Sequence, residues 1–342
     1  MFMQSGPVQR EVEGLLATAN SQQSQGQVAQ ALATLHGAKD RAQAGGGPGL
    51  TAQVMVAIAR VQTAAGQGDD AMVTMQGASD LFNQAGDQAS QIRALIQVAS
   101  LRAAAGQFDA ARSLVRSCLG TASQIGDNQL IAEVRLAAGQ LLLNTRYAAA
   151  AADEFRAGLA VATALPDATA QVQLRAFLAV AVFHCGNAVE AFNLLAEDAK
   201  VAQAMPDGIA GGLGLAAVSD AMTTIQRPRD ALIIGKQALT RLQLTGVQPL
   251  ILQATIGLAN LYALVGQSAE AAQCTSQAVA AANQLGGPAA MANTLMQLGA
   301  TAMRRGDHMT ARDLLRQARS QAKTAGLPEP PILTQMLGQL GE

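Results

Sequence analysis

One fixed period governs this sequence. Stepping by 40 from Ala31 meets alanine eight times in succession, at Ala31, Ala71, Ala111, Ala151, Ala191, Ala231, Ala271 and Ala311. Eight landings on one residue type at fixed spacing are not expected by chance. A period of this length is typical of stacked supersecondary units, each of which buries its apolar face against its neighbours. The chain is therefore predicted to be a repeat array.

Two further columns mark turns in every unit. Five residues before each alanine lie Gly26, Gly66, Gly106, Arg146, Gly186, Gln226, Gly266 and Gly306. Fifteen residues after each alanine lie Gly46, Gly86, Gly126, Pro166, Pro206, Gly246, Gly286 and Gly326, all of them helix breakers. Each unit is thus predicted to run helix A, tight turn, helix B, breaker. At Arg146 and Gln226 the turn rule fails, which indicates either turn variation or a local change in curvature or contacts.

Between the breakers the apolar spacing is helical. Leu95, Val98 and Ala99 occupy positions i, i+3 and i+4, which lie on one face of an α-helix. No stretch alternates with the two-residue period of a strand. Helix A also carries a small residue twelve positions before each column alanine, at Ala19, Ala59, Ala99, Gly139, Ala179, Ser219, Ala259 and Gly299. Small residues facing each other let two antiparallel helices approach closely, so the chain is predicted to be all-α.

This pattern of small residue, turn glycine and alanine resembles the tetratricopeptide repeat (TPR). The unit of that family has 34 residues, so the 40-residue units here are more similar to kinesin-light-chain-like and MalT-type repeats. Tyr262 alone keeps a common aromatic position of helix A. The resemblance implies a right-handed α-solenoid of about eight helix-turn-helix repeats, predicted as one domain over residues 1–326, with a C-terminal capping helix over residues 327–342.

The capping segment has its own pattern. Following Pro328, Pro330 and Pro331, one helical face gathers the apolar residues Ile332, Leu333, Met336, Leu337 and Leu340. Such a segment ordinarily covers the last repeat of an array. Its opposite face carries little charge, so self-association through the chain ends is an alternative.

Composition narrows the function classes. Charged residues make up only 14%, mean hydropathy is +0.18, and 23 Lys and Arg nearly balance 24 Asp and Glu. The balance disfavours a nucleic-acid partner, and no apolar run is long enough for membrane insertion. We expect a cytoplasmic protein, because the first residues lack the pattern of a secretory signal. The preference for arginine over lysine is typical of a GC-rich bacterial genome.

The resemblance also implies a partner-binding groove lined by the A helices, which holds a peptide or an amphipathic helix of another protein. Carried over in register, its positions are Arg60, Arg93, Ile96, Glu133, Leu136, Gln140, Phe177, Val180, His184, Asp220, Ile256, Asn260, Met296 and Arg304. The predicted groove is apolar and amide-rich, and only Asn260 and Arg304 could grip a carboxylate. Phe177 and Met296 are equally compatible with a place in the core.

Enzymatic chemistry finds little support. Three cysteines stand far apart, no metal-ligand or nucleophile motif is present, and His184 and Cys185 are adjacent only in sequence. We therefore expect no cofactor, no metal and no catalytic residue. A basic cluster in the last repeat favours a solvated face over contact with an acidic partner or phosphates: Arg304, Arg305, Arg312, Arg316, Arg319 and Lys323.

The sequence thus predicts a non-enzymatic interaction scaffold or adaptor. Two alternatives stay open, a self-assembling structural subunit that forms homo-oligomers through its ends, and a module that senses a ligand or peptide.

Overall fold

The computed structural model describes residues 6–24, 27–166, 168–326 and 329–341. In this part of the chain all regular structure is helical, which confirms the all-α prediction. The helices are α1 (Pro7–Ser24), α2 (Val28–Gly45), α3 (Gly47–Ala64), α4 (Gly68–Gln84), α5 (Gln88–Ala104), α6 (Phe108–Ile125), α7 (Asn128–Asn144), α8 (Ala148–Ala162), α9 (Thr169–His184), α10 (Ala188–Ala204), α11 (Ile209–Thr224), α12 (Pro228–Thr245), α13 (Gln248–Leu264), α14 (Ser268–Arg304), α15 (His308–Thr324) and α16 (Pro331–Gln339).

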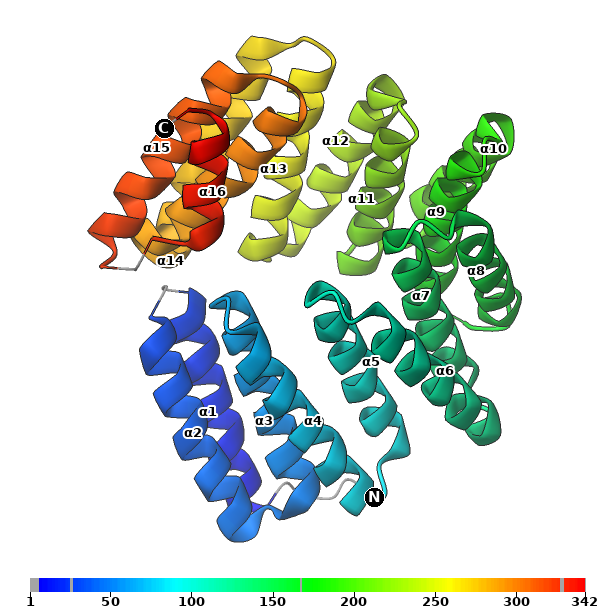
Figure 1. Cartoon of the computed structure of the whole chain (residues 1–342), viewed down its shortest axis with the longest axis vertical. Coiled ribbons are helices and arrows are strands. Elements are labelled where there is room, and N and C mark those ends of the chain that lie inside the picture. The colour runs from blue at the N-terminus through cyan, green and yellow to red at the C-terminus, as the bar shows by residue number, and fades with distance from the viewer. Residues whose placement is uncertain (1–5, 25–26, 167, 327–328, 342) are drawn as a thin grey trace. The chain divides into compact units, whose positions relative to one another are not determined.

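The helices gather into two compact units, α1 to α9 and α10 to α16. Within each unit, helices consecutive in sequence pack side by side (Figure 1). The 40-residue period continues through both units, with odd-numbered helices in the place of helix A up to α13. The single domain over residues 1–326 stays a prediction.

The column alanines lie where helices A and B meet. Ala31, Ala71, Ala111, Ala151, Ala191, Ala231 and Ala311 are all fully buried. Ala271 alone is partly exposed. The predicted role of the column as the contact between paired helices therefore holds in seven repeats, and the seventh repeat is more open.

The A-to-B turns share one backbone conformation. Glycines 66, 106, 186, 266 and 306 have φ between 76° and 90°, the left-handed region that an L side chain disfavours. Arg146 and Gln226 take the same conformation, each with φ of 64°. The two exceptional repeats thus keep the turn and change only its residue, while Gly26 lies outside the described residues.

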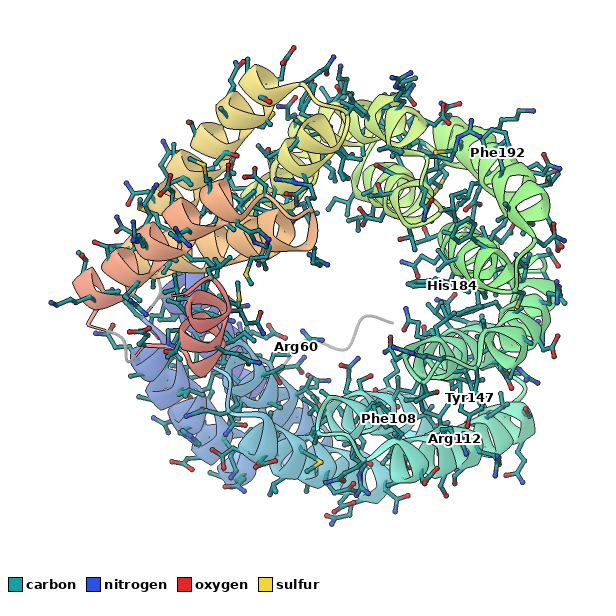
Figure 2. All side chains as sticks on the ribbon, turned by 45° about the horizontal axis from the view of Figure 1, so that its top comes forward. Arg60, Phe108, Arg112, Tyr147, His184 and Phe192 are labelled. Atoms are coloured by element: carbon teal, nitrogen blue, oxygen red, sulfur yellow. The ribbon has the colours of Figure 1, made fainter. Side chains whose placement is uncertain are left out.

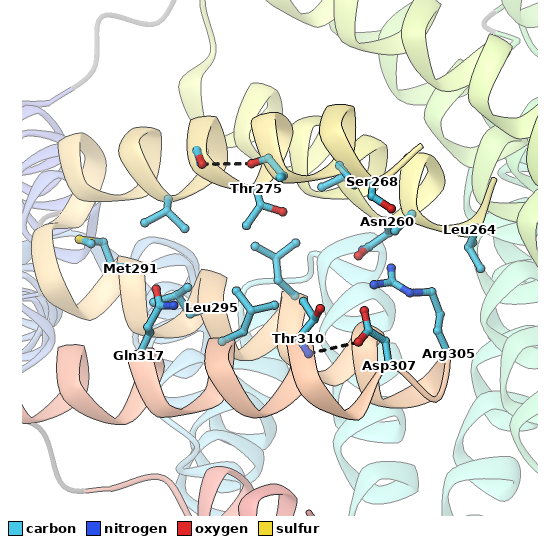
Figure 3. A pocket seen from close by; sticks show the side chains of 18 of the residues that line it. Asn260, Leu264, Ser268, Thr275, Met291, Leu295, Arg305, Asp307, Thr310 and Gln317 are labelled. Atoms are coloured by element: carbon cyan, nitrogen blue, oxygen red, sulfur yellow. Dashed lines mark hydrogen bonds between the residues drawn. The ribbon is translucent and has the colours of Figure 1, made fainter. Parts of the chain in front are cut away.

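The predicted breaker Gly46 separates α2 from α3, and the left-handed residue of this corner is its neighbour Gly47 (φ 76°, against −99° for Gly46). One predicted breaker needs a correction. Near Gly286, the helical residues of α14 extend without a gap from Ser268 to Arg304, although Gly287 has φ of 58° and Pro288, which follows it, has no N–H to donate. The two halves of α14 nevertheless run in opposite directions, as Ser268, Thr275, Met291 and Leu295 show (Figure 3). The chain therefore reverses its direction within α14, near Gly287.

In most repeats a small residue at position i of helix A packs against a large residue at position i+16, in helix B. We call this pairing the size match. The small residue of helix A faces a large one in helix B, as in Gly139 and Phe155 or Gly299 and Leu315. The large members are Leu35, Met75, Val115, Phe155, Leu195 and Leu315, all at most 4% exposed. The sixth and seventh repeats carry Gly235 and Thr275 there instead. In these two repeats the large side chain is missing.

Helix α16 covers the end of the second unit, which confirms the predicted capping helix in its described part. Leu333, Leu337 and Leu340 join the core formed with Leu314 and Leu315. Arg312 Nη2 donates a hydrogen bond to the Leu340 carbonyl at 2.6 Å, and Arg319 pairs with Glu329. Ile332, predicted on the apolar stripe, is 55% exposed, because the cap is only nine residues long and buries one narrow face. Residues 327, 328 and 342 of the predicted segment lie outside the described residues.

Candidate binding surfaces

Three cavities lie in repeats in which the size match is weak. The seventh repeat, with Ala259 and Thr275, lines a cavity of about 1020 Å³. The sixth, with Ser219 and Gly235, lines one of about 510 Å³. A third cavity, of about 350 Å³, is lined by Ala99 and by Val115, the smallest of the six large residues. Each of these three cavities is thus lined by a repeat whose helix B residue, Thr275, Gly235 or Val115, is smaller than leucine.

The cavity of the sixth repeat brings together four predicted groove residues. Asp220 on α11, Ile256 and Asn260 on α13, and Arg304 at the end of α14 all line it. We call this cavity the α11–α13 groove; its further lining residues include Leu213, Gln253, Gln297 and Thr301. Ile256 lines the floor of this groove, where it is only 5% exposed and also packs in the core.

Asp220 is the distinctive charge of this groove. Its side chain stays open to solvent along the groove, yet the surrounding walls remove enough water to raise the pKa of its carboxyl above the ordinary value. Among the described residues no cation forms an ion pair with it, and its neighbours on α13 are amides and apolar groups. The site therefore holds a carboxylate that a cationic group would stabilise.

The first unit holds the other predicted groove residues on α5 and α7. Arg93 Nε donates to Glu133 Oε2 at 2.8 Å, and this hydrogen bond raises the pKa of the guanidinium. Ile96 and Gln140 line the cavity of about 350 Å³, while Glu133 and Leu136 line a smaller one of about 180 Å³. The predicted charges of Arg93 and Glu133 thus neutralise each other.

The remaining predicted positions lie outside these cavities. Phe177 is half-buried and stacks on the core residue Phe155, with ring centroids 5.7 Å apart. Met296 packs against the core of the second unit, so both residues take the core role that the sequence left open. Arg60 and His184 are exposed, Val180 is half-buried, and His184 lies edge-on to Phe183 (Figure 2).

The cavity of the seventh repeat was missed by reasoning from sequence. It lies between the first half of α14 and α15, with Leu295, Leu298 and Leu314 at its base and Arg305, Asp307 and Thr310 at one end (Figure 3). We call it the α14–α15 trough. Its signal in the sequence is Thr275, which breaks a column of large apolar residues four positions after the column alanine.

No assembled catalytic centre emerges. In the described part of the chain, no three His, Cys, Asp or Glu side chains gather in a way that could hold a metal ion. Cys118 is buried and its pKa is raised to about 11 by desolvation, whereas Cys185 is exposed at the end of α9. No described helix combines the length and hydrophobicity needed to cross a membrane.

Comparison with solved structures agrees with this geometry. A Rap protein in complex with competence and sporulation factor superposes with a TM-score of 0.50 at 12% identity, over 97% of this chain and 98% of that one. The fold is that of tetratricopeptide-like repeats. Other TPR-like neighbours are the apo form of RapI (TM-score 0.49, 11% identity, 80% of this chain and 99% of that one) and BtubC from P. vanneervenii (0.46, 15%, 63% and 88%). No family model matches the sequence, and a search of curated proteins found no match.

Proposed function

We propose that this protein is a non-enzymatic interaction scaffold that binds a peptide segment of a partner protein in the α11–α13 groove. The observation that carries the proposal is Asp220, an acidic side chain that lines a groove of about 510 Å³ and has no ion-pair partner among the described residues. A basic side chain of the peptide pairs with Asp220, since an opposite charge favours the ionised form of a carboxylate whose hydration is reduced.

The rest of the groove suits a peptide backbone. Gln253, Asn260 and Gln297 offer amide donors and acceptors for peptide N–H and C=O groups. Leu213, which is 38% exposed, and Ile209 one turn before it, 45% exposed, form an apolar lip on α11. Apolar burial on this lip supplies about 25 cal/mol per Å², and the amides fix the orientation of the segment.

The neighbours are compatible with this role. The Rap protein with the same fold is described in complex with a factor, so an array of this kind accommodates a bound ligand. If binding alters the packing of α11 against α13, the scaffold is also a peptide sensor. We place the scaffold function first because the groove residues support binding directly.

A phage-displayed random peptide library tests the proposal. We expect selected peptides to contain Lys or Arg and to bind the wild type at least tenfold more tightly than Asp220→Asn or Asn260→Ala. Glu270→Gln, which removes an exposed acid of α14 outside the groove, is the matched control and retains binding. Equal binding to Asp220→Asn and wild type would remove this groove as the site.

A further inference from the structure

The α14–α15 trough is a second cavity of this unit, which Asp220 does not line, although Asn260 and Arg304 line both cavities. One wall is the first half of α14, from Ser268 to Asn283, and the other is α15 from Thr310 to Gln317. Leu295 and Leu298 on the second half of α14, together with Leu314, form an apolar base that is at most 9% exposed (Figure 3). The trough thus has an apolar floor between two polar rims.

The trough is long enough to hold an α-helix, and we call the space between its walls the helix bed. Its α14 wall extends over fifteen residue steps, which at 1.5 Å each is about 22 Å, or roughly four helical turns. That wall is built from small side chains: Ser268, Ala271, Ala272, Thr275, Ser276, Val279, Ala280 and Asn283. Small residues on one helix allow a second helix to approach closely, and the missing large residue at Thr275 widens the bed at its middle.

Arg305 gives the trough a charge preference at one end. Its Nη1 atom is buried and has no hydrogen-bond partner among the described residues. Burial lowers the pKa of the guanidinium, which is the direction expected of a cation that has lost water without gaining a full partner. The nearby Asp307 is engaged as the N-cap of α15, where its Oδ1 accepts from the Thr310 N–H at 3.1 Å. Arg305 as a whole is half-buried and lines the trough, so its guanidinium is the positive charge that an acidic group entering this end would meet.

We propose that the α14–α15 trough binds an amphipathic helix of a partner protein, with large apolar side chains on Leu295, Leu298 and Leu314 and an acidic side chain on Arg305. Charge complementarity selects the acidic residue, because a planar guanidinium binds a carboxylate through paired hydrogen bonds. The apolar floor selects large side chains at spacings of three and four along the partner helix. The trough shares Asn260 and Arg304 with the α11–α13 groove, but Thr275 and Arg305 line the trough and not that groove, so variants at these two positions test this proposal separately from Asp220.

A displayed library of helical peptides about 18 residues long, randomised along one face, is the probe. We expect selection on the wild type to enrich large apolar residues at i and i+3 or i+4 together with Asp or Glu near one end. The consensus peptide should then bind Thr275→Leu at least tenfold more weakly, because leucine fills the bed. Gln277→Leu places the same side chain at an exposed position of α14 outside the trough and should leave binding unchanged.

Arg305→Met separates charge recognition from apolar binding. Replacing the acidic residue of the consensus peptide by its amide should weaken binding to the wild type at least tenfold and leave binding to Arg305→Met unaltered. Asp220→Asn should not affect any of these values, and urea unfolding of each variant verifies that it folds. The proposal is overturned if no peptide is enriched, or if folded Thr275→Leu binds the consensus peptide as tightly as the wild type does. It is also overturned if replacing the acidic residue of the peptide weakens binding to Arg305→Met as much as it weakens binding to the wild type. A concentration-dependent oligomer that Thr275→Leu abolishes would overturn it in favour of a second copy of this chain.

Discussion

Phe155 on α8 fills the space that a side chain on Gly139 of α7 would need. A Cβ built at Gly139 would collide with the Phe155 ring, and Phe155 itself is fully buried. This pair is the tightest version of the size match that recurs between positions i and i+16.

Gly139→Ala should therefore destabilise the protein by about 1–3 kcal/mol through overpacking. Phe155→Leu makes room for the added methyl group, so the double variant should lose less stability than the sum of the two single variants. Gly120→Ala is the control, because nothing lies within 4 Å of its added Cβ and its position is exposed within α6. The control should be neutral or more stable than wild type in urea unfolding. If the stability loss of the double variant equalled the sum of the two single losses, the proposed steric contact between positions 139 and 155 would be contradicted.

The left-handed turns make a second prediction. Arg146 and Gln226 hold φ of 64°, a region that costs a side-chain-bearing residue about 1 kcal/mol or more. Arg146→Gly and Gln226→Gly should each raise the free energy of unfolding by about 0.5–1 kcal/mol, measured by urea titration. Arg116→Gly, at an exposed position inside α6, should instead lower it by about 1 kcal/mol. Destabilisation by the two turn substitutions would show that these side chains make contacts that outweigh the strain.

Arg241 joins α12 to the end of α10. Its Nη1 donates to the carbonyls of Ala202 and Met205 at 2.9 and 3.0 Å, and its Nη2 donates to that of Gln203 at 2.6 Å. These carbonyls have no helical partner beyond the helix end, so the guanidinium takes that place. Arg241→Ala should cost about 2–3 kcal/mol of stability, and Arg241→Lys should recover less than half of it, since one ammonium does not reproduce the fork. Arg229→Ala, an exposed arginine of the same helix, should change stability by less than about 0.5 kcal/mol.

The three thiols should react in order of exposure. Cys185 is exposed, Cys274 is partly buried with a raised pKa, and Cys118 is buried with a pKa of about 11. Because the thiolate is the nucleophile, Cys118 is almost wholly protonated at about pH 8 and also shielded from reagent. Ellman's reagent should give one fast phase, one slower phase, and release from Cys118 only at the rate of unfolding. Cys185→Ser should remove the fast phase; its persistence would mean that another thiol is exposed.

The sequence alone was sufficient for the repeat architecture. The alanine column and the turn glycines report backbone contact and backbone conformation, which depend on single residue types and so are visible in one chain. The predicted breaker Gly46 does separate α2 from α3, but the sequence does not identify Gly47 as the left-handed residue, because in a run of glycines any member can adopt that conformation.

The candidate sites were predicted less well. Four predicted residues do line one groove, but Ile256, one turn before Asn260, is only 5% exposed there and also packs in the core. The burial of such a residue depends on the rotation of α13 about its axis, which apolar spacing determines only loosely. The trough was missed because its cause is the absence of a large side chain at Thr275. A search for motifs looks for particular residues that are present, so it does not detect a cavity that arises because a large side chain is missing.

The size match has a consequence for how this array could have grown. Its two members, at i and i+16, fall within one repeat unit, which means that duplicating or deleting a whole unit carries both along. A join that keeps the 40-residue register also preserves the match, whereas a join out of register would place other residues opposite each other. Inheritance in steps of one whole unit therefore preserves core volume automatically, and units such as the sixth and seventh, which depart from the match, are free to diverge without disturbing their neighbours.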